Sequence, residues 1–366
     1  MRILHYYQRD VPMISLHVKM LCEGMGMKAE NHTAVTSDDA KTLLFGGNYD
    51  IFHLHGCWRN SSYSIVKMAL QQGARLVVTP HGQLEPWVVN EYWWKEKFAK
   101  LMKYQRNVIS KAYIVILQGQ MEQERMNQLG WNRRCIIIRN CVITRSISMQ
   151  NMARQTMAAY RKVLDSNPLE LMTNETKALL KCILNAGITG DARWLAVKKN
   201  NHSTLNFAEW RKLLCYAYQE EISDTMLRGI QVLGLEAPDI DVSEIGFFTP
   251  DNYCPSNSIQ AIIGNSFVSE NDRLIATFRY LRKLAASHQL CIRHFVELDR
   301  ELRQHECDED LLKENLDEQR LYLLTARLMQ LASELTGLTE GFMPVPPLND
   351  RTTQRIRYQI YNHLKI

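Results

Sequence analysis

The sequence predicts an α/β protein in which a Rossmann-like parallel sheet domain is followed by a mainly α-helical domain. Two observations carry this prediction. Over residues 1–145, six short apolar runs alternate with segments of helical spacing, with one strand and one helix every 20 to 30 residues. Strands that alternate with helices at this spacing form parallel sheets with right-handed crossovers. Over residues 146–366, helical spacing continues with few strand candidates, which predicts a helical domain.

Each expected strand is a short segment rich in apolar or β-branched residues. The six expected strands are residues 3–7, 32–36, 50–55, 75–79, 112–117 and 135–139. Between them, apolar residues at intervals of three and four predict helices. These helices are residues 13–21, 38–44, 61–71, 91–109 and 121–129. Asp38 and Asp39 are expected to cap the second helix. Glycines stand where helices are expected to end: Gly24 and Gly26, Gly46 and Gly47, and Gly73.

The second half of the chain reads as a series of helices. The expected helices are residues 158–164, 175–185, 207–219, 224–233, 271–286, 291–303, 314–335 and 351–364. Turn residues separate them, among them Pro168, Gly187, Gly190 and Pro238. The role of this domain is not indicated by its sequence.

Length and composition exclude several classes of protein. A chain of 366 residues fits two domains, and 46% apolar with 23% charged residues is typical of a globular protein. No apolar stretch approaches the roughly 20 residues of a membrane-spanning helix, and the N-terminus has no apolar run of signal-peptide length. Nine cysteines without a C-x-x-C pair indicate free thiols rather than a disulfide framework or a zinc ribbon. We therefore expect a cytoplasmic protein, either free or peripheral at the inner face of the membrane.

Charge is distributed unevenly along the chain. Residues 1–150 contain 19 Lys and Arg against 11 Asp and Glu, a net charge of +8, whereas residues 151–366 carry a net charge of −3. A basic half favours phosphate-bearing ligands or an anionic membrane surface. Nucleic acid is not expected as a partner, because no stacking aromatic residues are interleaved with Arg133, Arg134 and Arg139. The sequence also has neither a G-x-S-x-G elbow nor a phosphate loop, which argues against those two classes of hydrolase.

Three segments fall beyond the carboxyl ends of expected strands, where open parallel sheets bind their ligands. They are H-G-C-W-R at residues 55–59, P-H-G-Q-L-E-P-W at residues 80–87 and L-Q-G at residues 117–119. Glycine lets the backbone approach a ligand closely, and histidine can bind a hydroxyl group or exchange a proton. Trp58 and Trp87 could form platforms for a sugar ring, and Arg59 could hold a phosphate.

A metal pair is an alternative for the third strand. His53 and His55 lie two residues apart, so both side chains point to the same face of the strand. No third ligand is predicted beside them. We therefore expect no metal, and we interpret His53 as a buried, hydrogen-bonded side chain.

The run D-I-F-H-L-H-G-C-W at residues 50–58, followed by A-R-L-V-V-T-P-H-G-Q-L-E-P-W at residues 74–87, resembles the N-terminal half of GT-B glycosyltransferases, and family 4 in particular. The resemblance covers residues 1–145. It implies half of a GT-B fold: an acceptor-binding domain that works with a second, donor-binding domain. It also implies a nucleotide sugar as the donor and no cofactor or metal.

The resemblance implies roles for the residues beyond the strands. His81 would be the catalytic residue, beside the transferring sugar together with Gly82. The other implied substrate-binding residues are His55, Gly56, Trp58, Arg59, Glu85, Trp87 and Gln118.

Two parts of the family pattern have no counterpart. The turn after the first strand, residues 8–12, contains no glycine, and the donor half is not recognised after residue 145. Three interpretations therefore stay open. The chain could be a complete glycosyltransferase of cell-envelope polysaccharide synthesis, one half of a split transferase whose donor site lies on a partner protein, or a non-catalytic scaffold that binds a glycan or a partner. The acceptor would be a glycan or a lipid-linked sugar.

The helix expected at residues 91–109 has an apolar stripe that includes Trp94 and Phe98, with a basic arc opposite that includes Lys95 and Lys103. Such a helix could lie against a membrane and bring a lipid-linked acceptor within reach. It could equally pack on the sheet with its basic face in water, and we favour this second interpretation.

Overall fold

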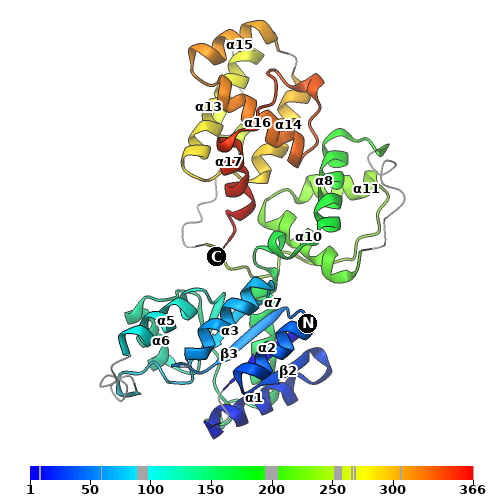
Figure 1. The fold of residues 1–366 in the computed structure, drawn as a ribbon. Coiled ribbons are helices and arrows are strands. Elements are labelled where there is room, and N and C mark those ends of the chain that lie inside the picture. The colour runs from blue at the N-terminus through cyan, green and yellow to red at the C-terminus, as the bar shows by residue number, and fades with distance from the viewer. Residues whose placement is uncertain are drawn as a thin grey trace. The chain divides into compact units, whose positions relative to one another are not determined.

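The chain forms two compact units, Met1–Leu164 and Asp165–Ile366, each with its own hydrophobic core (Figure 1). A computed structural model describes residues 1–7, 10–58, 60–88, 98–193, 205–250, 258–264, 267, 269–305 and 307–365. Arg59 and the first part of the helix expected at residues 91–109 lie outside the described residues.

The first unit is built on a sheet of six parallel strands, as the sequence predicts. The strands are β1 (Arg2–Tyr6), β2 (Glu30–Ala34), β3 (Ile51–His55), β4 (Arg75–Thr79), β5 (Ile114–Leu117) and β6 (Cys135–Ile137). They lie in the order β2-β1-β3-β4-β5-β6, which confirms a Rossmann-like α/β fold for this unit. β2 is added on one side of β1, whereas β3 to β6 are added one after another on the other side. The direction in which strands are added therefore changes between β1 and β3, and α/β proteins bind ligands at such a position.

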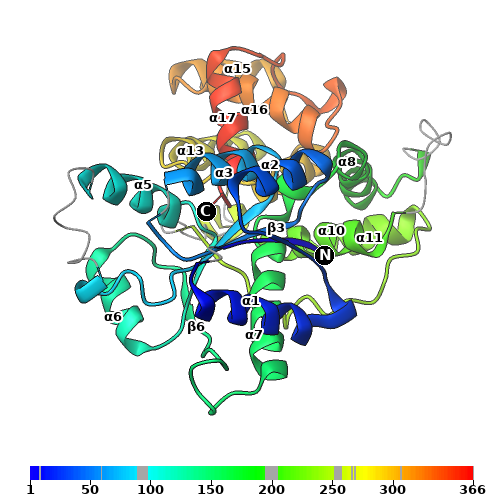
Figure 2. The ribbon, with the colours of Figure 1, turned by 60° about the horizontal axis from the view of Figure 1, so that its bottom comes forward.

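Helices cover both faces of the sheet. The helices on one face, which we call the apolar face, are α2 (Ser37–Gly46), α3 (Asn60–Gln71), α5 (Phe98–Ser110) and α6 (Gln120–Leu129). α1 (Pro12–Met25) and α7 (Met149–Asp165) lie on the opposite face, as Figure 2 shows. Alternate strand residues such as Leu4, Phe52 and Val78 point into the core of the apolar face. The strand residues between them therefore point towards α1 and α7, and among these are histidines.

Local sequence explains where α2 begins. Thr36 is the N-cap: its hydroxyl accepts a hydrogen bond from the Asp39 backbone at 3.1 Å, and the Asp39 carboxylate accepts one from the Thr36 backbone at 3.2 Å. The prediction that Asp38 and Asp39 cap this helix is therefore wrong for Asp38. The two reciprocal bonds form because threonine stands three residues before an acidic side chain.

The first unit continues one helix beyond the boundary that the sequence analysis places at residue 145. α7 buries Met152, Ala153 and Tyr160 against the rest of this unit. A Cβ atom on Gly24 of α1 would lie only 2.8 Å from the Cβ of Ala153, so the close approach of α1 and α7 depends on the missing side chain at Gly24. The helix expected at residues 158–164 is the second half of α7.

The described residues of the second unit form α-helices joined by turns and short 3₁₀ segments. The α-helices are α8 (Asn174–Thr189), α10 (Phe207–Gln219), α11 (Ser223–Val232), α12 (Ile259–Ile263), α13 (Glu270–Ala286), α14 (Ile292–Gln304), α15 (Glu309–Glu318), α16 (Tyr322–Leu335) and α17 (Arg351–Asn362). Two expectations are corrected here. Gly187 lies inside α8 rather than in a turn, and residues 314–335 belong to two helices, because Arg320 adopts a left-handed conformation with φ 55°.

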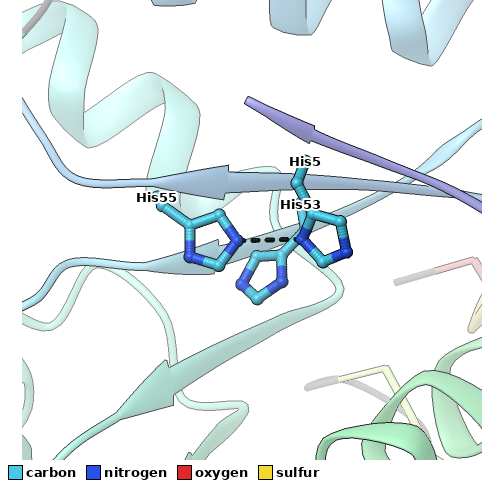
Figure 3. Close-up of side chains that lie close together, drawn as sticks. All are labelled: His5, His53 and His55. Carbon is cyan, nitrogen blue, oxygen red and sulfur yellow. Dashed lines mark hydrogen bonds between the residues drawn. The ribbon is translucent and has the colours of Figure 1, made fainter. Parts of the chain in front are cut away.

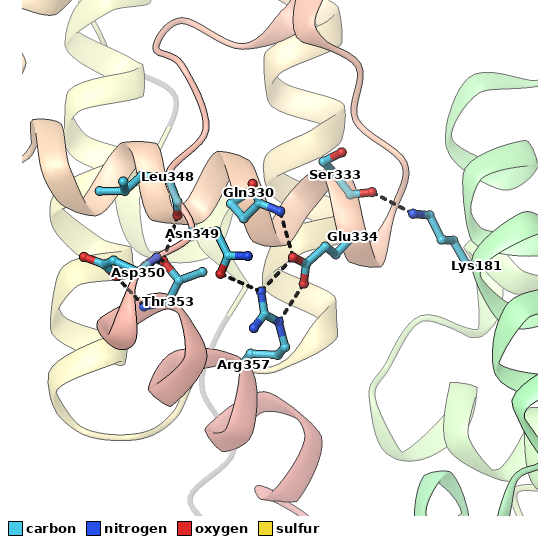
Figure 4. Close-up of polar contacts among 9 residues, drawn as sticks. All are labelled: Lys181, Gln330, Ser333, Glu334, Leu348, Asn349, Asp350, Thr353 and Arg357. Atoms are coloured by element: carbon cyan, nitrogen blue, oxygen red, sulfur yellow. Dashed lines mark hydrogen bonds and ion pairs between the residues drawn. The ribbon is translucent and has the colours of Figure 1, made fainter.

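Polar contacts attach the last helix, α17, to its neighbours (Figure 4). Arg357 donates hydrogen bonds to both carboxylate oxygens of Glu334 on α16, each at 2.7 Å. Asp350 caps α17 by accepting a hydrogen bond from the backbone of Thr353 at 2.8 Å. Lys181 of α8 donates to a backbone carbonyl of α16 at 2.8 Å, so that three helices are linked around the apolar core. In the described part of the chain, no helix combines the length and the apolar character needed to cross a bilayer.

Candidate functional site

Histidines from β1 and β3 gather on the face of the sheet that α1 and α7 cover. His5, His53 and His55 are each 1% exposed or less, and Figure 3 shows them side by side. The ring centroids of His53 and His55 lie 3.8 Å apart. His17 from α1 and His81 after β4 join them, with ring centroids 4.8 Å apart. These five histidines form what we call the imidazole cluster, at the position between β1 and β3 where the direction of strand addition changes.

Hydrogen bonds join three of the rings into a chain that ends in an amide on each side. His5 Nε2 lies 3.2 Å from Asn31 Oδ1, and His5 Nδ1 lies 3.0 Å from His55 Nε2. His55 Nδ1 lies 3.2 Å from His81 Nε2, and His81 Nδ1 lies 2.6 Å from Gln118 Nε2. Because the Asn31 amide group donates to a backbone carbonyl, its oxygen faces His5. We therefore assign all three rings the neutral tautomer that is protonated at Nε2, with Gln118 as the first donor and Asn31 as the last acceptor.

Burial holds the imidazole cluster in its neutral form. It lowers the pKa of His5 from its usual 6.5 to about 4; the hydrogen bond to Asn31 partly opposes this shift, and the imidazole of His17 adds to it. The pKa of His53, His55 and His81 is held well below 6.5, and that of His17 is also lowered, with burial as the main cause in each case. Neutral rings can each donate one hydrogen bond and accept another, as the chain requires.

His53 is a structural member of the cluster. Its Nδ1 lies 2.5 Å from the hydroxyl of Tyr160 on α7, and its Nε2 lies 2.7 Å from Oγ1 of Thr79 on β4. Both ring nitrogens are therefore engaged, which confirms the interpretation of His53 as a buried, hydrogen-bonded side chain.

The two histidine–glycine segments, which we call the β3 corner (residues 55–58) and the β4 corner (residues 80–84), meet through Gln83. The side-chain oxygen of Gln83 accepts a hydrogen bond from the backbone of Cys57, and its backbone carbonyl accepts one from Nε1 of Trp58 at 2.6 Å. A Cβ atom on Gly56 would lie 3.1 Å from the same side-chain oxygen. Glycine at position 56 therefore lets the two corners approach each other closely.

Both corners contain residues in the left-handed region. The φ angle is 87° at Gly56, 67° at Trp58, 56° at His81 and 75° at Gly82. For a side chain as large as that of tryptophan such a conformation is rare, and it costs about 1–3 kcal/mol. Backbone strain of this kind persists where the surrounding contacts enforce it, and it is concentrated at ligand and catalytic sites.

Glu122 of α6 fixes the β4 corner relative to β5. One carboxylate oxygen accepts a hydrogen bond from the backbone of Gly82, and the other accepts one from the backbone of Gln118 at 2.5 Å. Burial raises the pKa of the Glu122 carboxyl, although the two backbone donors favour its ionised form. His81 and Gln118, which share a hydrogen bond, are thus positioned by one carboxylate.

We expect Glu122→Ala to lower the free energy of unfolding of the first unit by about 3 kcal/mol, because it leaves two backbone N–H groups without their acceptor. Chemical denaturation followed by far-ultraviolet circular dichroism measures this loss. Glu124→Ala, at an exposed position of the same helix, is the control and should change stability by less than about 0.5 kcal/mol. Equal effects of the two substitutions would contradict the role assigned to Glu122.

The cluster offers nitrogen donors that could hold a metal ion. Two sets of three histidines each bring one ring nitrogen per residue within 4.8 Å of the others: His5, His53 and His55, and His17, His55 and His81. The prediction that His53 and His55 have no third ligand beside them is therefore wrong, because His5 lies next to both. Neither set contains a carboxylate, so a divalent ion would bring two uncompensated positive charges into a buried site.

The structure brings most of the predicted site residues together. His55, Gly56, Trp58, His81, Gly82 and Gln118 lie at the two corners or in the hydrogen-bonded chain. Glu85 is buried, whereas Trp87 is 57% exposed and Arg59 lies outside the described residues. Trp58 is half-buried and uses its indole N–H to join the corners. The platform expected from Trp58 is therefore a fixed part of the corner.

Several residues of the imidazole cluster are not predicted from the sequence. His5 lies on β1, beside His53 in the sheet register, and its proximity follows from the placement of β1 next to β3. His5 lies in the first expected strand, but no local sequence pattern predicts which strands are neighbours in the sheet. Asn31, His17 and Tyr160 reach the cluster from β2, α1 and α7, and no spacing rule connects them with residues 53–55.

No family model matches the chain, and neither a curated protein nor a solved structure matches it. Function is therefore inferred from the chemistry of the imidazole cluster and the two corners. Neutral imidazoles, a strained glycine-containing turn and the amide of Gln118 stand at the carboxyl edge of the sheet, and groups of this kind can bind hydroxyl groups and exchange their protons.

Proposed function

We propose that the chain is a glycosyltransferase-like protein of cell-envelope polysaccharide synthesis, and that its first unit binds the sugar acceptor at the two corners. The observation that supports this best is the hydrogen bond between His55 and His81, which joins the corners where an open α/β sheet binds its ligand. Sugars are recognised through their hydroxyl groups, and His81, the half-buried ring at the end of the hydrogen-bonded chain, can exchange its bond to Gln118 for one to such a group.

His81 is the proposed catalytic residue. In the structure its Nδ1 accepts a hydrogen bond from Gln118, so an acceptor hydroxyl would take the place of the Gln118 amide on this nitrogen. As the hydroxyl oxygen attacks the sugar carbon of the donor and the nucleotide diphosphate leaves, Nδ1 takes the hydroxyl proton. His81 is then positively charged, and burial opposes this charge. The hydrogen bond from His81 Nε2 to His55 lets the two rings share the charge, which stabilises it.

The donor is a nucleotide sugar in this proposal, and no metal takes part in the transfer. The described residues of the second unit form helices rather than a second strand-and-helix domain, so a partner protein that supplies the donor site is part of the proposal. A scaffold that binds a glycan without catalysis is the second candidate. It is favoured by the same helical unit, because the described residues of this unit contain no second strand-and-helix domain that could hold the donor.

Calorimetry with a panel of nucleotide sugars and glycan acceptors tests the proposal on the full chain, alone and with the products of adjacent genes. We expect an acceptor glycan to bind the lone chain, and a nucleotide sugar to bind either the lone chain or the chain with its partner. Transfer, followed by mass change of the acceptor, should fall by about 100-fold or more in His81→Asn. Asparagine tolerates the left-handed φ of position 81, so this variant removes the imidazole without adding backbone strain.

His32→Asn is the control, because His32 lies on β2 outside the imidazole cluster and should leave acceptor binding and transfer unchanged. Acceptor binding without transfer, under every donor and partner tried, would favour the scaffold. An absence of binding to any glycan or nucleotide sugar would refute both candidates, and unchanged transfer in His81→Asn would show that another group takes the proton.

A further inference from the structure

Three helix ends of the second unit meet at a carboxylate, a thiol and an imidazole. Glu220 follows α10, Cys291 precedes α14 and His363 follows α17, so these residues are far apart in the sequence. One ligand atom from each, a carboxylate oxygen, the sulfur and a ring nitrogen, lies within 4.8 Å of the other two. The side chain of Glu220 is 0% exposed and that of His363 is 11% exposed. We call this group the helix-end cluster.

The contacts inside the helix-end cluster resemble those of ligands around a shared ion. His363 donates its Nδ1 proton to the backbone carbonyl of Ile360 at 2.8 Å, which turns Nε2 towards Glu220. Nε2 lies 3.0 Å from a carboxylate oxygen of Glu220, and among the described residues no well-aligned hydrogen bond reaches either oxygen of this buried carboxylate. A metal-binding histidine typically donates its other N–H to a carbonyl in this way.

The charges and the donor atoms of Glu220, Cys291 and His363 indicate which ion this group would bind. A thiolate, a carboxylate and a neutral imidazole carry two negative charges, which balance one divalent cation in a buried place. Sulfur, nitrogen and oxygen donors together are the ligand set of Zn²⁺. The imidazole cluster of the first unit, by contrast, has nitrogen donors without a compensating charge.

We propose that Glu220, Cys291 and His363 bind one Zn²⁺ ion that joins the ends of α10, α14 and α17. Cys291 binds as a thiolate, its proton leaves to solvent, and a water molecule or the second oxygen of Glu220 completes four ligands. In the structure the thiol of Cys291 faces Nδ1 of His294 at 3.2 Å, and this nitrogen also accepts a hydrogen bond from the backbone of Cys291, so the zinc ion would take the place of the thiol proton. The ion would hold the last helix against the rest of the second unit, independently of the function proposed for the first.

Metal substitution in the reduced, full-length chain tests the site. After treatment with a chelator, the protein should bind one equivalent of Zn²⁺ and, with Co²⁺ in its place, show the charge-transfer absorption of a cobalt–thiolate bond. That band cannot come from the imidazole cluster, which offers only nitrogen donors. Cys291→Ser should remove the band and weaken Zn²⁺ binding by more than about 100-fold, since losing a ligand costs more than losing a group that orients one.

Cys307→Ser is the matched control, because Cys307 lies in the same unit outside the helix-end cluster, and it should keep the band. His363→Gln should weaken Zn²⁺ binding while Cys291 stays in place, which gives a second test if Cys291→Ser does not fold. A wild-type chain that binds no Zn²⁺, that gives no thiolate band with Co²⁺, or that loses its band in Cys307→Ser rather than Cys291→Ser would overturn the proposal.

Discussion

Gly187→Ala is expected to destabilise the second unit by about 3 kcal/mol or more. Gly187 of α8 faces a backbone carbonyl of α11, and a Cβ atom at this position would lie 2.1 Å from the oxygen of Thr225. The reverse contact exists too, because a Cβ atom on Gly229 of α11 would lie 2.0 Å from the oxygen of Ile183. Backbone atoms inside two helices cannot move aside like a flexible side chain, so α8 and α11 would have to separate.

Thermal and urea unfolding of the full chain measure this effect, and Gly229→Ala should behave in the same way. The two losses should add incompletely in the double variant, since one separation of the helices relieves both clashes. Gly46→Ala is the control: Gly46 lies in a helix with open space around it, and alanine there should be neutral or stabilising by up to about 1 kcal/mol. Stability within about 0.5 kcal/mol of wild type in Gly187→Ala would contradict the close helix crossing.

Acid is expected to destabilise the first unit through the imidazole cluster. A histidine whose pKa is lowered in the folded state binds a proton more readily when unfolded, so stability is lost as the pH falls below the unfolded pKa of about 6.5. For His5, whose folded pKa is about 4, the loss is about 3 kcal/mol and is complete near pH 4. His17, His53, His55 and His81 have lowered pKa values too and add to the loss in the same direction.

Denaturant unfolding between pH 7.5 and pH 4 measures the slope of stability against pH. His5→Gln should reduce this slope by about 1.4 kcal/mol per pH unit over the window between the two pKa values, the contribution of one proton. Ile3→Val, a substitution of a buried neighbour on the same strand, is the control and should lower stability by about 1 kcal/mol at every pH alike. A slope that His5→Gln leaves unchanged would show that His5 takes up its proton without cost.

Much of the fold follows from the sequence because the first unit has strong local signals. The four residues after Arg75 form a continuous apolar and β-branched run that stops at a proline, and the observed β4, Arg75–Thr79, has the ends that the sequence predicts. The break between α15 and α16 was not predictable, because the residue in the left-handed conformation there is Arg320 rather than glycine or asparagine. The domain boundary expected at residue 145 rests on the point where alternating strands and helices give way to helices alone. The observed boundary lies after Leu164, because α7 packs against the first unit.

Part of the candidate site was predictable for a geometric reason. His55 is the last residue of β3 and His81 follows β4, and adjacent parallel strands end at the same edge, so their proximity follows from the sheet. The partners that complete the site could not be predicted in this way. Gln83 and Glu122 accept hydrogen bonds from backbone N–H groups. Every residue except proline has such a group, so no sequence pattern identifies these pairs.

The position of α7 has a practical consequence for dissecting the protein. Tyr160 occupies one nitrogen of His53 from a helix that the sequence alone would assign to the other half of the chain. A fragment that stops at residue 145 would expose the buried side of α1 and leave His53 with one partner fewer. Separate expression of the sugar-binding candidate therefore has to retain Leu164, the last residue of the first unit.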